Sequence, residues 1–561
     1  MLNLTLLMDA LFAVMACILL KNIFSQKKLT LIIPFIICIM AVATLLLFYI
    51  SNTTEIANVW LNSHSSTPLI YKICGVWGNH EGSMLLFFTC LTAWSALLLR
   101  ENNAICLASF VLLSLGCYLY FQANPFVVLA IKATSGQDLN PALQNLYLSI
   151  HPPILYLGQS LCLVLWVWAC FSPEHPRIQL YTRVCLGLIT TGLILGARWA
   201  YGELGWGGFW FWDPVETVSL FPWLAIMAAV HSEKSNRKCL LLSFPMVMLG
   251  LSLVRSGILV SVHSFGFDLQ NGIWLGLCSI LVCIATAFIF FKSTTAKITL
   301  VSTGFISCLA LLIALIFIPI ILNYCLGINA VIDEKFFHDF INPLTLFLLI
   351  FCGFTPYMKF RQYEWSIACF ILSTILWVSK FQPYFNYFAA FAAVISFWLI
   401  FSALKYCKQL FSKGFVAAHL GVGLCILGAS HGEIFTEKLE LKISELPVKL
   451  GSYVINYKSH LVIDNQQIHK EILNFSVNST EISPEILYFY TNKAIKNQSA
   501  WVRINLDHVH STIFTDSNNT WGTELMLKPM ITLFWLGLLF VLFGIFISIL
   551  QNFKKTSQLN C

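Results

Sequence analysis

Charged side chains are scarce in this sequence. Asp, Glu, Lys and Arg together make up 11% of its 561 residues, whereas 58% are hydrophobic. This number of charges is too small to give a chain of this size a water-soluble surface. The composition therefore excludes a soluble globular protein and predicts one that crosses a lipid bilayer many times. The formal net charge of +7 comes from basic residues scattered singly along short links. That scatter excludes the basic patch with which proteins bind nucleic acid.

Paired cysteine motifs are also absent. The sequence has 19 cysteines but no C-x-x-C pair, and its one long hydrophilic stretch, residues 431 to 527, contains no cysteine. Disulfides, zinc sites and a self-attached c-type haem are therefore not expected. The N terminus lacks the basic flank of a cleaved signal peptide and leads straight into an apolar run, so we expect it to form the first span.

Long apolar runs determine the predicted architecture. A helix needs about 20 apolar residues to cross a bilayer, and by that measure the sequence predicts about fifteen transmembrane helices. The runs lie near residues 2–20, 30–50, 83–99, 104–123, 148–170, 181–199, 214–231, 239–254, 272–291, 299–325, 342–358, 365–379, 384–404, 415–430 and 529–550.

Residues 431 to 527 differ from the rest of the chain because polar and apolar side chains alternate there, as in residues 438–443 and 452–457. A period of two residues is typical of strands with one buried face. We therefore predict an all-α polytopic membrane protein with a small β-rich extracytoplasmic domain before the last helix. The predicted parts are a transmembrane core at 1–430 with an outer loop at about 200–214, the β-rich domain at 431–527, and a last helix with its cytoplasmic-side tail at 528–561.

The basic residues predict which side of the membrane each link faces. If the predicted spans alternate in direction, most basic links fall on one side, which the positive-inside rule assigns to the cytoplasm or its mitochondrial equivalent. The outer loop and the β-rich domain then face the opposite side. The links on the basic side contain Lys21, Lys27, Lys28, Arg177, Arg183, Lys234, Arg237, Lys238, Lys292, Lys297, Lys359, Arg361, Lys405, Lys408, Lys413, Lys554 and Lys555.

The outer loop is unusually rich in aromatic side chains. Glycines leave its backbone free to bend, and indole rings favour the level at which a bilayer meets water. We interpret the loop as a shelf for a large, flat, partly apolar ligand, with an ordinary aromatic belt as the alternative. At its end, Asp213 and Pro214 have the pattern of an N-cap and a first helical residue. The shelf comprises Trp206, Gly207, Gly208, Phe209, Trp210, Phe211, Trp212 and Asp213.

Four of the 13 histidines fall at two depths in the predicted topology. His151 and His263 lie on the outer side, whereas His231 and His419 lie near the inner ends of two antiparallel spans. We expect Pro152 to keep His151 itself out of helical geometry. Because two imidazoles on opposite faces of a haem make a stable six-coordinate iron, the pairing predicts one outer and one inner haem site. Hydrogen-bonded packing histidines are the alternative.

Two arginines flank the outer cluster. Arg198 and Arg255 carry planar guanidinium groups that suit the two carboxylates of a porphyrin, although routine anchoring at the membrane interface explains each of them as well. Six further histidines, His338 and those around the β-rich region, are predicted to be solvated. They are His338, His431, His460, His469, His508 and His510.

These motifs resemble those of the WWD-domain haem-handling proteins, and among them the CcmF-type cytochrome c haem lyases. The resemblance spans most of the chain in the order of the family. It is carried by residues 206–216, 76–84, 151–153, 253–257, 261–264 and 418–421.

The resemblance implies a function and a set of roles. His151 and His263 would ligate the substrate haem on the outer side, residues 206–213 would hold the porphyrin, and His231 with His419 would ligate a permanent haem b in the membrane. Haem would arrive on a CcmE-like chaperone, and apocytochrome c would be presented with a CcmH-like thiol protein. The lyase would join the haem vinyl groups to the cysteines of a C-x-x-C-H segment, with quinol as a suggested reductant for the inner haem.

Other functions stay open at this point. A lyase dedicated to a special acceptor, such as nitrite reductase, would share the same motifs. A haem or solute transporter would use the shelf as an export gate, and a respiratory electron-transfer subunit would need the inner haem alone. The expected location is a bacterial plasma membrane or a mitochondrial inner membrane, with the shelf and the β-rich domain on the periplasmic or intermembrane side.

Overall fold

The computed structural model gives a largely helical chain with a β-rich region before the last helix. Of the described residues, eleven helices are long and apolar enough to cross a membrane, and two shorter apolar helices accompany them. The predicted fold class is thereby confirmed. The structure describes residues 2–25, 31–130, 133, 135–203, 208–210, 213–232, 237–258, 269–292, 299–326, 387–405, 413–465, 467–491, 493–517 and 520–558.

The chain divides into two compact units. The first consists of Met1–Leu195, Phe211–Leu344 and Asn552–Cys561, and the second of Gly196–Trp210 and Thr345–Gln551. The division falls within the outer loop, so the first half of that loop belongs to the second unit. The boundaries predicted for the core, the β-rich domain and the last helix stay a prediction.

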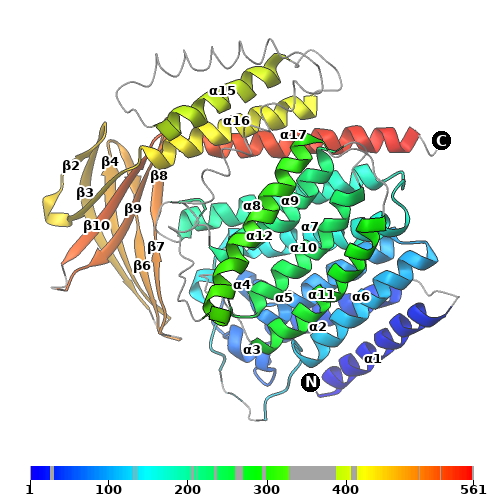
Figure 1. Cartoon of the computed structure of the whole chain (residues 1–561). Coiled ribbons are helices and arrows are strands. Elements are labelled where there is room, and N and C mark those ends of the chain that lie inside the picture. The colour runs from blue at the N-terminus through cyan, green and yellow to red at the C-terminus, as the bar shows by residue number, and fades with distance from the viewer. Residues whose placement is uncertain are drawn as a thin grey trace. The chain divides into compact units, whose positions relative to one another are not determined.

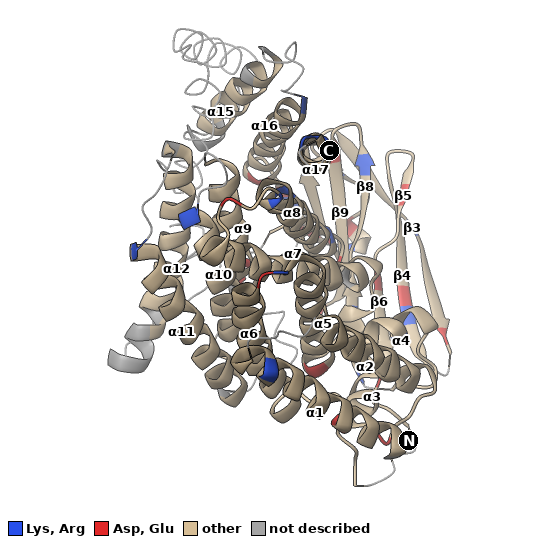
Figure 2. Cartoon of the chain, turned by 90° about the vertical axis from the view of Figure 1, so that its right-hand side faces the viewer, with Lys and Arg blue, Asp and Glu red and all other residues tan. Residues whose placement is uncertain are grey.

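The first unit is a bundle of helices, which Figure 1 shows running side by side. Charged residues are few along these helices and lie mainly near their ends (Figure 2). Its helices are α1 Leu2–Phe24, α2 Ile32–Ile50, α3 Ala57–Asn62, α4 Leu69–Gly75, α5 His80–Leu98, α6 Asn102–Phe121, the 3-10 turn Pro141–Leu143, α7 Leu146–Phe171, α8 Ile178–Glu203 as far as Leu195, α9 Pro214–Val230, α10 Arg237–Arg255, α11 Leu269–Lys292 and α12 Leu300–Leu326.

Helix α7 forms the centre of this bundle. Every residue from Leu161 to Ala169 is buried, because α7 packs against both α5 and α10. A helix that is apolar on all sides is one that other helices surround. On the α8 side, Gly192 allows a close approach, since a Cβ there would lie 3.0 Å from Cα of Leu155.

The second unit combines helices with two antiparallel sheets. One sheet has the strand order β1-β10-β9-β8, and the other has β2-β3-β4-β6-β7 with β5 paired to β4. The predicted β-rich region is thus confirmed. The elements are the end of α8 from Gly196, α15 Tyr387–Lys405, α16 Lys413–Ile434, β1 Glu437–Lys442, the 3-10 turn Ile443–Glu445, β2 Val448–Leu450, β3 Tyr453–Asp464, β4 Ile468–Val477, β5 Thr480–Ile482, β6 Glu485–Phe489, β7 Ile495–Gln498, β8 Ala500–Ile504, β9 Asp507–Thr515, β10 Trp521–Lys528 and α17 Ile531–Gln558 as far as Gln551.

The faces of the sheets explain the alternating sequence. Buried side chains of both sheets, including Ile455, Phe475, Val509 and Leu525, form one apolar core. Helices α16 and α17 meet through glycines instead, because a Cβ on Gly421 would lie 2.5 Å from the backbone oxygen of Gly537. Small residues of this kind let membrane helices bring their backbones into contact.

The predicted spans agree with the described helices. Thirteen of them overlap the eleven long and two shorter apolar helices. The predicted runs at 342–358 and 365–379 lie outside the described residues. The short helices α3 and α4, which lie between the second and third predicted spans, were not predicted.

Candidate functional site

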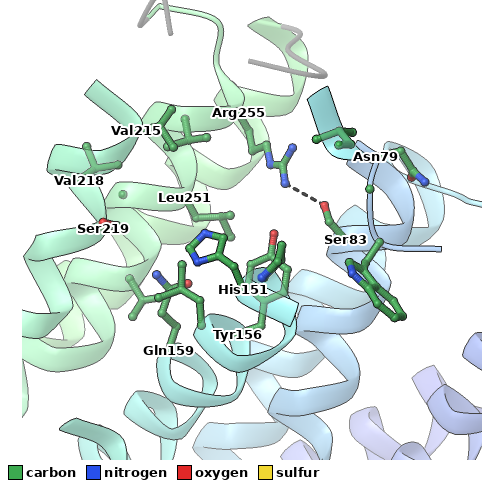
Figure 3. A pocket seen from close by; sticks show the side chains of 18 of the residues that line it. Asn79, Ser83, His151, Tyr156, Gln159, Val215, Val218, Ser219, Leu251 and Arg255 are labelled. Carbon is green, nitrogen blue, oxygen red and sulfur yellow. Dashed lines mark hydrogen bonds between the residues drawn. The ribbon is translucent and has the colours of Figure 1, made fainter. Parts of the chain in front are cut away.

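A pocket of about 210 Å³ lies in the first unit between the turn before α5 and helices α7, α9 and α10. Its wall is largely apolar, with a few polar groups set into it. Figure 3 shows His151, Tyr156 and Gln159 projecting from α7, opposite Arg255 and Ser83. A concave apolar site with a few convergent polar groups is the usual form of a small-molecule site.

His151 projects from α7 into this pocket. Its Nδ1 lies 2.7 Å from the backbone oxygen of Gly192 on α8. Because a carbonyl only accepts, the proton sits on Nδ1 and the lone pair of the ring sits on Nε2. Ligating histidines are commonly oriented in this way by a carbonyl behind the ring.

The prediction that His151 lies outside helical geometry was wrong. Helix α7 begins at Leu146 and contains His151, Pro152 and Pro153. A proline has no N–H, so it leaves one backbone oxygen of the preceding turn without its helical donor. The helix can continue where that oxygen accepts a hydrogen bond from another group. Pro153 has no N–H for the oxygen of Ser149, and the indole Nε1 of Trp77 donates to that oxygen at 3.0 Å. The bond from Trp77 thus links α7 to the turn before α5.

Arg255 is the charged group of the pocket. It ends α10, and Gly257 follows with a φ of 70°, the left-handed backbone that ends many helices. Its Nη2 donates to Oγ of Ser83 at 2.8 Å, as Figure 3 shows, and Ser83 donates to the backbone oxygen of His80. Within the part of the chain that the structure describes, the buried Nε of Arg255 has no hydrogen-bond partner. An arginine N–H beside a cavity suits an anionic group of a ligand.

The segment 76–84 builds the turn that carries Trp77 and Ser83. Asn79 caps α5 by accepting from the backbone N–H of Gly82 at 2.8 Å, and its side chain also accepts from Asn58. Gly82 has no room for a side chain, because a Cβ would lie 1.7 Å from the backbone oxygen of Val76. Asn79 is therefore the N-cap of α5. Sequence reasoning noted this segment without assigning it a place in the site.

The aromatic shelf is described in part. Trp206, Gly207, Phe211 and Trp212 lie outside the described residues. Within the second unit, the ring of Phe209 stacks on Phe534 of α17 with centroids 3.9 Å apart.

Asp213 at the end of the shelf confirms the predicted N-cap. Its Oδ2 accepts from the backbone N–H of Val215 at 3.2 Å, and Pro214 is the first residue of α9. An extended cap followed by proline is the usual start of a helix. Val215 and Ser219, one turn further along α9, line the pocket.

The predicted inner ligands share one local arrangement. His231 is the C-cap of α9 in the first unit, and its Nδ1 lies 2.9 Å from the backbone oxygen of Met227. His419 lies on α16 in the second unit, with Nδ1 2.9 Å from the backbone oxygen of Phe415. Both rings therefore carry the proton on Nδ1 and the lone pair on Nε2. His431 makes the same bond to Leu427, so this bond alone does not identify a ligand.

The other predicted site residues divide between the units. Arg198 lies on α8 within the second unit, where its guanidinium packs over aromatic rings. His263 lies outside the described residues. No group of three or more His, Cys, Asp or Glu side chains among the described residues is arranged to hold a metal ion. A site with two axial histidines would not form such a group.

Several histidines predicted to be solvated are buried. His431, His508 and His510 are 2%, 3% and 0% exposed, because strand β9 and helix α16 turn them inward. His460 and His469 do lie at the surface, where both contact Glu471. His338 lies outside the described residues.

The comparisons with known proteins point to cytochrome c biogenesis. The sequence profile of a family described as "Cytochrome C assembly protein" matches residues 77–174 and 177–260, a stretch that includes Trp77, His151, His231 and Arg255. A "Cytochrome c-type biogenesis protein CycK" of Rhizobium meliloti (strain 1021) is 38% identical over 287 residues, which cover 46% of this chain and 42% of that protein. The matched part of this chain therefore spans less than half the length of that relative.

Longer matches exist at lower identity. A "Cytochrome c-type biogenesis protein CcmF" of Haemophilus influenzae (strain ATCC 51907 / DSM 11121 / KW20 / Rd) is 28% identical over 586 residues, covering 90% of this chain and 89% of that protein. Among solved structures, "Cytochrome c Heme Lyase CcmF" superposes with a TM-score of 0.79 at 15% identity, covering 97% of this chain and 96% of the other. That likeness establishes a shared fold.

The helical bundle, the pocket and the matching profile together define a multi-span membrane protein of cytochrome c assembly. Within that class, the chain is similar over most of its length to the CcmF-type cytochrome c haem lyases. The resemblance stated from the motifs is thereby confirmed.

Proposed function

We propose that the chain attaches haem to apocytochrome c through thioether bonds. The observation that supports this most directly is His151, whose ring enters an apolar pocket in the tautomer that presents Nε2, beside Arg255. An imidazole and a guanidinium on one pocket suit the iron and a carboxylate of one porphyrin. The relatives that are named for cytochrome c biogenesis fit the same function.

The chemistry needs no nucleophile from this chain. Each cysteine thiol of the acceptor C-x-x-C-H segment adds across a vinyl group of haem. A sulfur–carbon bond forms, and the thiol hydrogen passes to the other vinyl carbon, so nothing is oxidised or reduced overall. The contribution of the chain is to hold the haem, orient its vinyl edge and exclude water.

The residues then take separate roles. His151 ligates the substrate iron, with His263 as its partner ligand, and the shelf residues 206–213 lie against the porphyrin. Arg255 binds one carboxylate of the porphyrin. Arg198, the residue that the sequence suggested for the other carboxylate, packs over the ring of Trp501 instead. Trp77 and Ser83 support this arrangement, since Trp77 donates to Ser149 on α7 and Ser83 accepts from Arg255.

A resident haem b is proposed for His231 and His419. The two imidazoles suit such a group, because each has Nδ1 bonded to a backbone oxygen one turn earlier, which fixes the tautomer with the lone pair on Nε2. When bound, this haem would supply electrons that keep the substrate iron ferrous, with quinol as their proposed source. His231 is also fixed through its own backbone oxygen, which accepts from Thr299 at 2.9 Å.

The proposed partners are a CcmE-like haem chaperone, a CcmH-like thiol protein and apocytochrome c. The proposed location is a bacterial plasma membrane or a mitochondrial inner membrane, with the shelf and the β-rich region on the periplasmic or intermembrane side. The distribution of basic residues between the links supports this orientation.

A complementation experiment tests the function. In cells that lack their own lyase, the wild-type chain should yield cytochrome c whose haem resists extraction by acid and solvent, and His151→Ala should abolish that product. His469→Ala, which removes a surface imidazole, is the matched control. A haem exporter would instead move haem across the membrane and give no covalent product, and a lyase dedicated to one acceptor would fail on a general cytochrome c. Either result would refute the general lyase.

A further inference from the structure

The first half of the aromatic shelf is joined to the β-rich region. Residues 196–210, which comprise the last two turns of α8 and the start of the shelf, belong to the second unit together with β8, β9 and α17. The contacts of β8 and β9 with residues 196–210 indicate a role for these strands.

Tyr201 and His508 form the centre of the contact. The hydroxyl of Tyr201 lies 2.8 Å from Nδ1 of His508 on β9, and Nε2 of His508 lies 3.2 Å from the hydroxyl of Thr532 on α17. A buried neutral imidazole donates from one nitrogen and accepts at the other, so both of these bonds can form together. The ring of His508 thus connects three elements: the end of α8, strand β9 and the start of α17.

Arg198 packs against the same elements. Its guanidinium carbon lies 4.5 Å from the ring centre of Trp501 on β8 and 5.5 Å from that of Trp535 on α17. Trp501 in turn stacks on His508, with ring centres 4.7 Å apart and planes 18° from parallel. Guanidinium groups bind aromatic faces well, because the negative face of the ring attracts the cation. Arg198 is therefore held by the rings of the second unit.

Further contacts continue up to the shelf. The hydroxyl of Ser499 donates to the backbone oxygen of Gly202 at 2.8 Å, and Lys496 pairs with Glu203 at 2.7 Å. The two side chains of this ion pair are 10% and 6% exposed, so little water screens it. Phe209 then stacks on Phe534. The β-rich region or α17 thus contacts five described residues of this stretch, namely Arg198, Tyr201, Gly202, Glu203 and Phe209.

We propose that β8, β9 and the start of α17 form a clamp that sets the position of the first half of the shelf, with Arg198, Tyr201 and His508 as positioning residues for haem attachment. The inference rests on the proposed function of the shelf. Because α8 is continuous up to Glu203, a change in the direction of its last two turns moves the backbone that begins the shelf. Arg198 acts through this clamp rather than by binding a porphyrin carboxylate.

The experiment combines amide hydrogen exchange with the yield of covalent cytochrome c. Exchange is measured on the full-length chain in nanodiscs, at residues 196–203. Tyr201→Phe removes a single oxygen and keeps the ring, so it should fold, and it should speed exchange there about fivefold, the factor expected for one lost hydrogen bond. His508→Ala should act in the same direction. Both variants should lower the yield of covalent cytochrome c without changing the content of resident haem.

Two further variants separate positioning from general damage. His508→Asn can still bond to Tyr201, because its side-chain amide lies near the position of Nδ1, and it should restore slow exchange and most of the yield. His469→Ala removes an imidazole from the same region at the surface and should change neither quantity. An Arg198→Gln variant should lower the yield for haem and for its dimethyl ester alike, since it acts through position rather than through a carboxylate.

Two results would overturn the clamp. One is unchanged exchange at residues 196–203 in both Tyr201→Phe and His508→Ala. The other is faster exchange with a wild-type yield of covalent cytochrome c. Failure of the proposed function would look different, because the wild-type chain itself would then give no covalent product while the exchange measurements would still decide whether the clamp exists.

Discussion

At the scale of single residues, two side chains that enter the pocket depend on atoms behind them. His151 is oriented by the backbone oxygen of Gly192, and Arg255 is oriented by Ser83. In both cases the partner comes from another helix, so the geometry of the site depends on how closely these helices pack. Substitutions of the supporting residues should therefore act on the site almost as strongly as substitutions of the pocket residues themselves.

A substitution at Gly192 tests this dependence of the site on helix packing. A Cβ at this position would lie 3.0 Å from Cα of Leu155, so Gly192→Val must separate α7 from α8 and move the acceptor of His151. We expect a loss of about 1–3 kcal/mol in stability, as overpacking usually costs, and a lower yield of covalent cytochrome c. Thermal unfolding in detergent measures the first effect. Gly276→Ala is the control, because a Cβ there meets nothing within 4 Å, and equal effects of the two substitutions would contradict the argument.

Arg255 should make the pocket bind haem more tightly than a haem whose carboxylates are esterified. Its Nε is buried beside the pocket and unpaired within the described residues. Arg255→Gln should weaken binding of haem roughly 10-fold to 100-fold, the usual effect of a lost hydrogen bond to a charged group, and Arg255→Lys should weaken it less. Titration with haem and with its dimethyl ester measures the difference. If the ester loses as much affinity as haem does, Arg255 does not bind a carboxylate.

At the scale of elements, glycine spacing determines how α16 packs against α17. Gly414, Gly421 and Gly428 recur every seven residues on α16, and each would place a Cβ within 3 Å of a backbone atom of α17. Because His419 lies between the first two of these glycines, the same contact holds the helix that carries the proposed inner ligand. Close backbone contact is a common means of association for membrane helices.

Gly421→Val tests this contact. The added side chain would meet the backbone oxygen of Gly537, an atom that cannot move without moving α17. We expect the melting temperature in detergent to fall and the absorption of any haem bound through His419 to decrease with it. Gly276→Ala again provides the control. An unchanged melting temperature in this variant would show that the contact between α16 and α17 does not contribute to stability.

The buried histidines of strand β9 should make the stability of the β-rich region depend on pH. Burial lowers the pKa of His508 to about 3, and it lowers the pKa of His510 well below 6.5, with Lys528 and Arg198 adding to the effect on His510. Neither ring nitrogen of His510 has a hydrogen-bond partner among the described residues. Around them lie Tyr201, Lys528 with its partner Glu433, and Arg503.

The sign of the effect follows from these shifts. Between pH 6.5 and about 3 the unfolded chain binds protons that the folded chain does not, so stability is fully present above pH 6.5 and is lost as the pH falls. The loss is roughly 1.4 kcal/mol per pH unit for each histidine. Protease resistance of residues 437–528 in the full-length chain should fall between pH 7.5 and 5. His510→Leu should lessen that fall, and an identical pH dependence in this variant and the wild type would contradict the prediction.

At the scale of the whole molecule, the aromatic shelf belongs to both units. Its first residues are held by the β-rich region and α17, whereas Asp213 begins α9, whose next turn lines the pocket. The shelf is thus the stretch of chain through which the β-rich region can influence haem attachment. A deletion of residues 437–528 should therefore remove the proposed lyase activity while leaving His151 and its pocket intact, which haem binding by the deletion variant would show.

Much of the architecture could be predicted because it follows from local patterns. Apolar runs of sufficient length identified the spans, and alternation identified the β-rich region, since both patterns reflect the surroundings of one segment. The N-cap at Asp213 could be predicted for the same reason, because it depends only on the residues next to it in the sequence. Among the site residues, His151 and Arg255 were found from the sequence and line one pocket. The shared roles proposed for His231 and His419 stay a prediction.

The sequence by itself determined which segments are apolar enough to cross a membrane, which region is rich in β-strands and which residue types are available to bind haem. Only the tertiary structure decided which of them meet: His151 with Gly192 across 41 residues, Arg255 with Ser83 across 172, and Tyr201 with His508 across 307. It also decided that Arg198 packs on aromatic rings and that His508 and His510 are buried. The physical reason is that hydropathy and periodicity describe the environment of each helix or strand, whereas neighbours are chosen by packing between surfaces that are apolar almost everywhere.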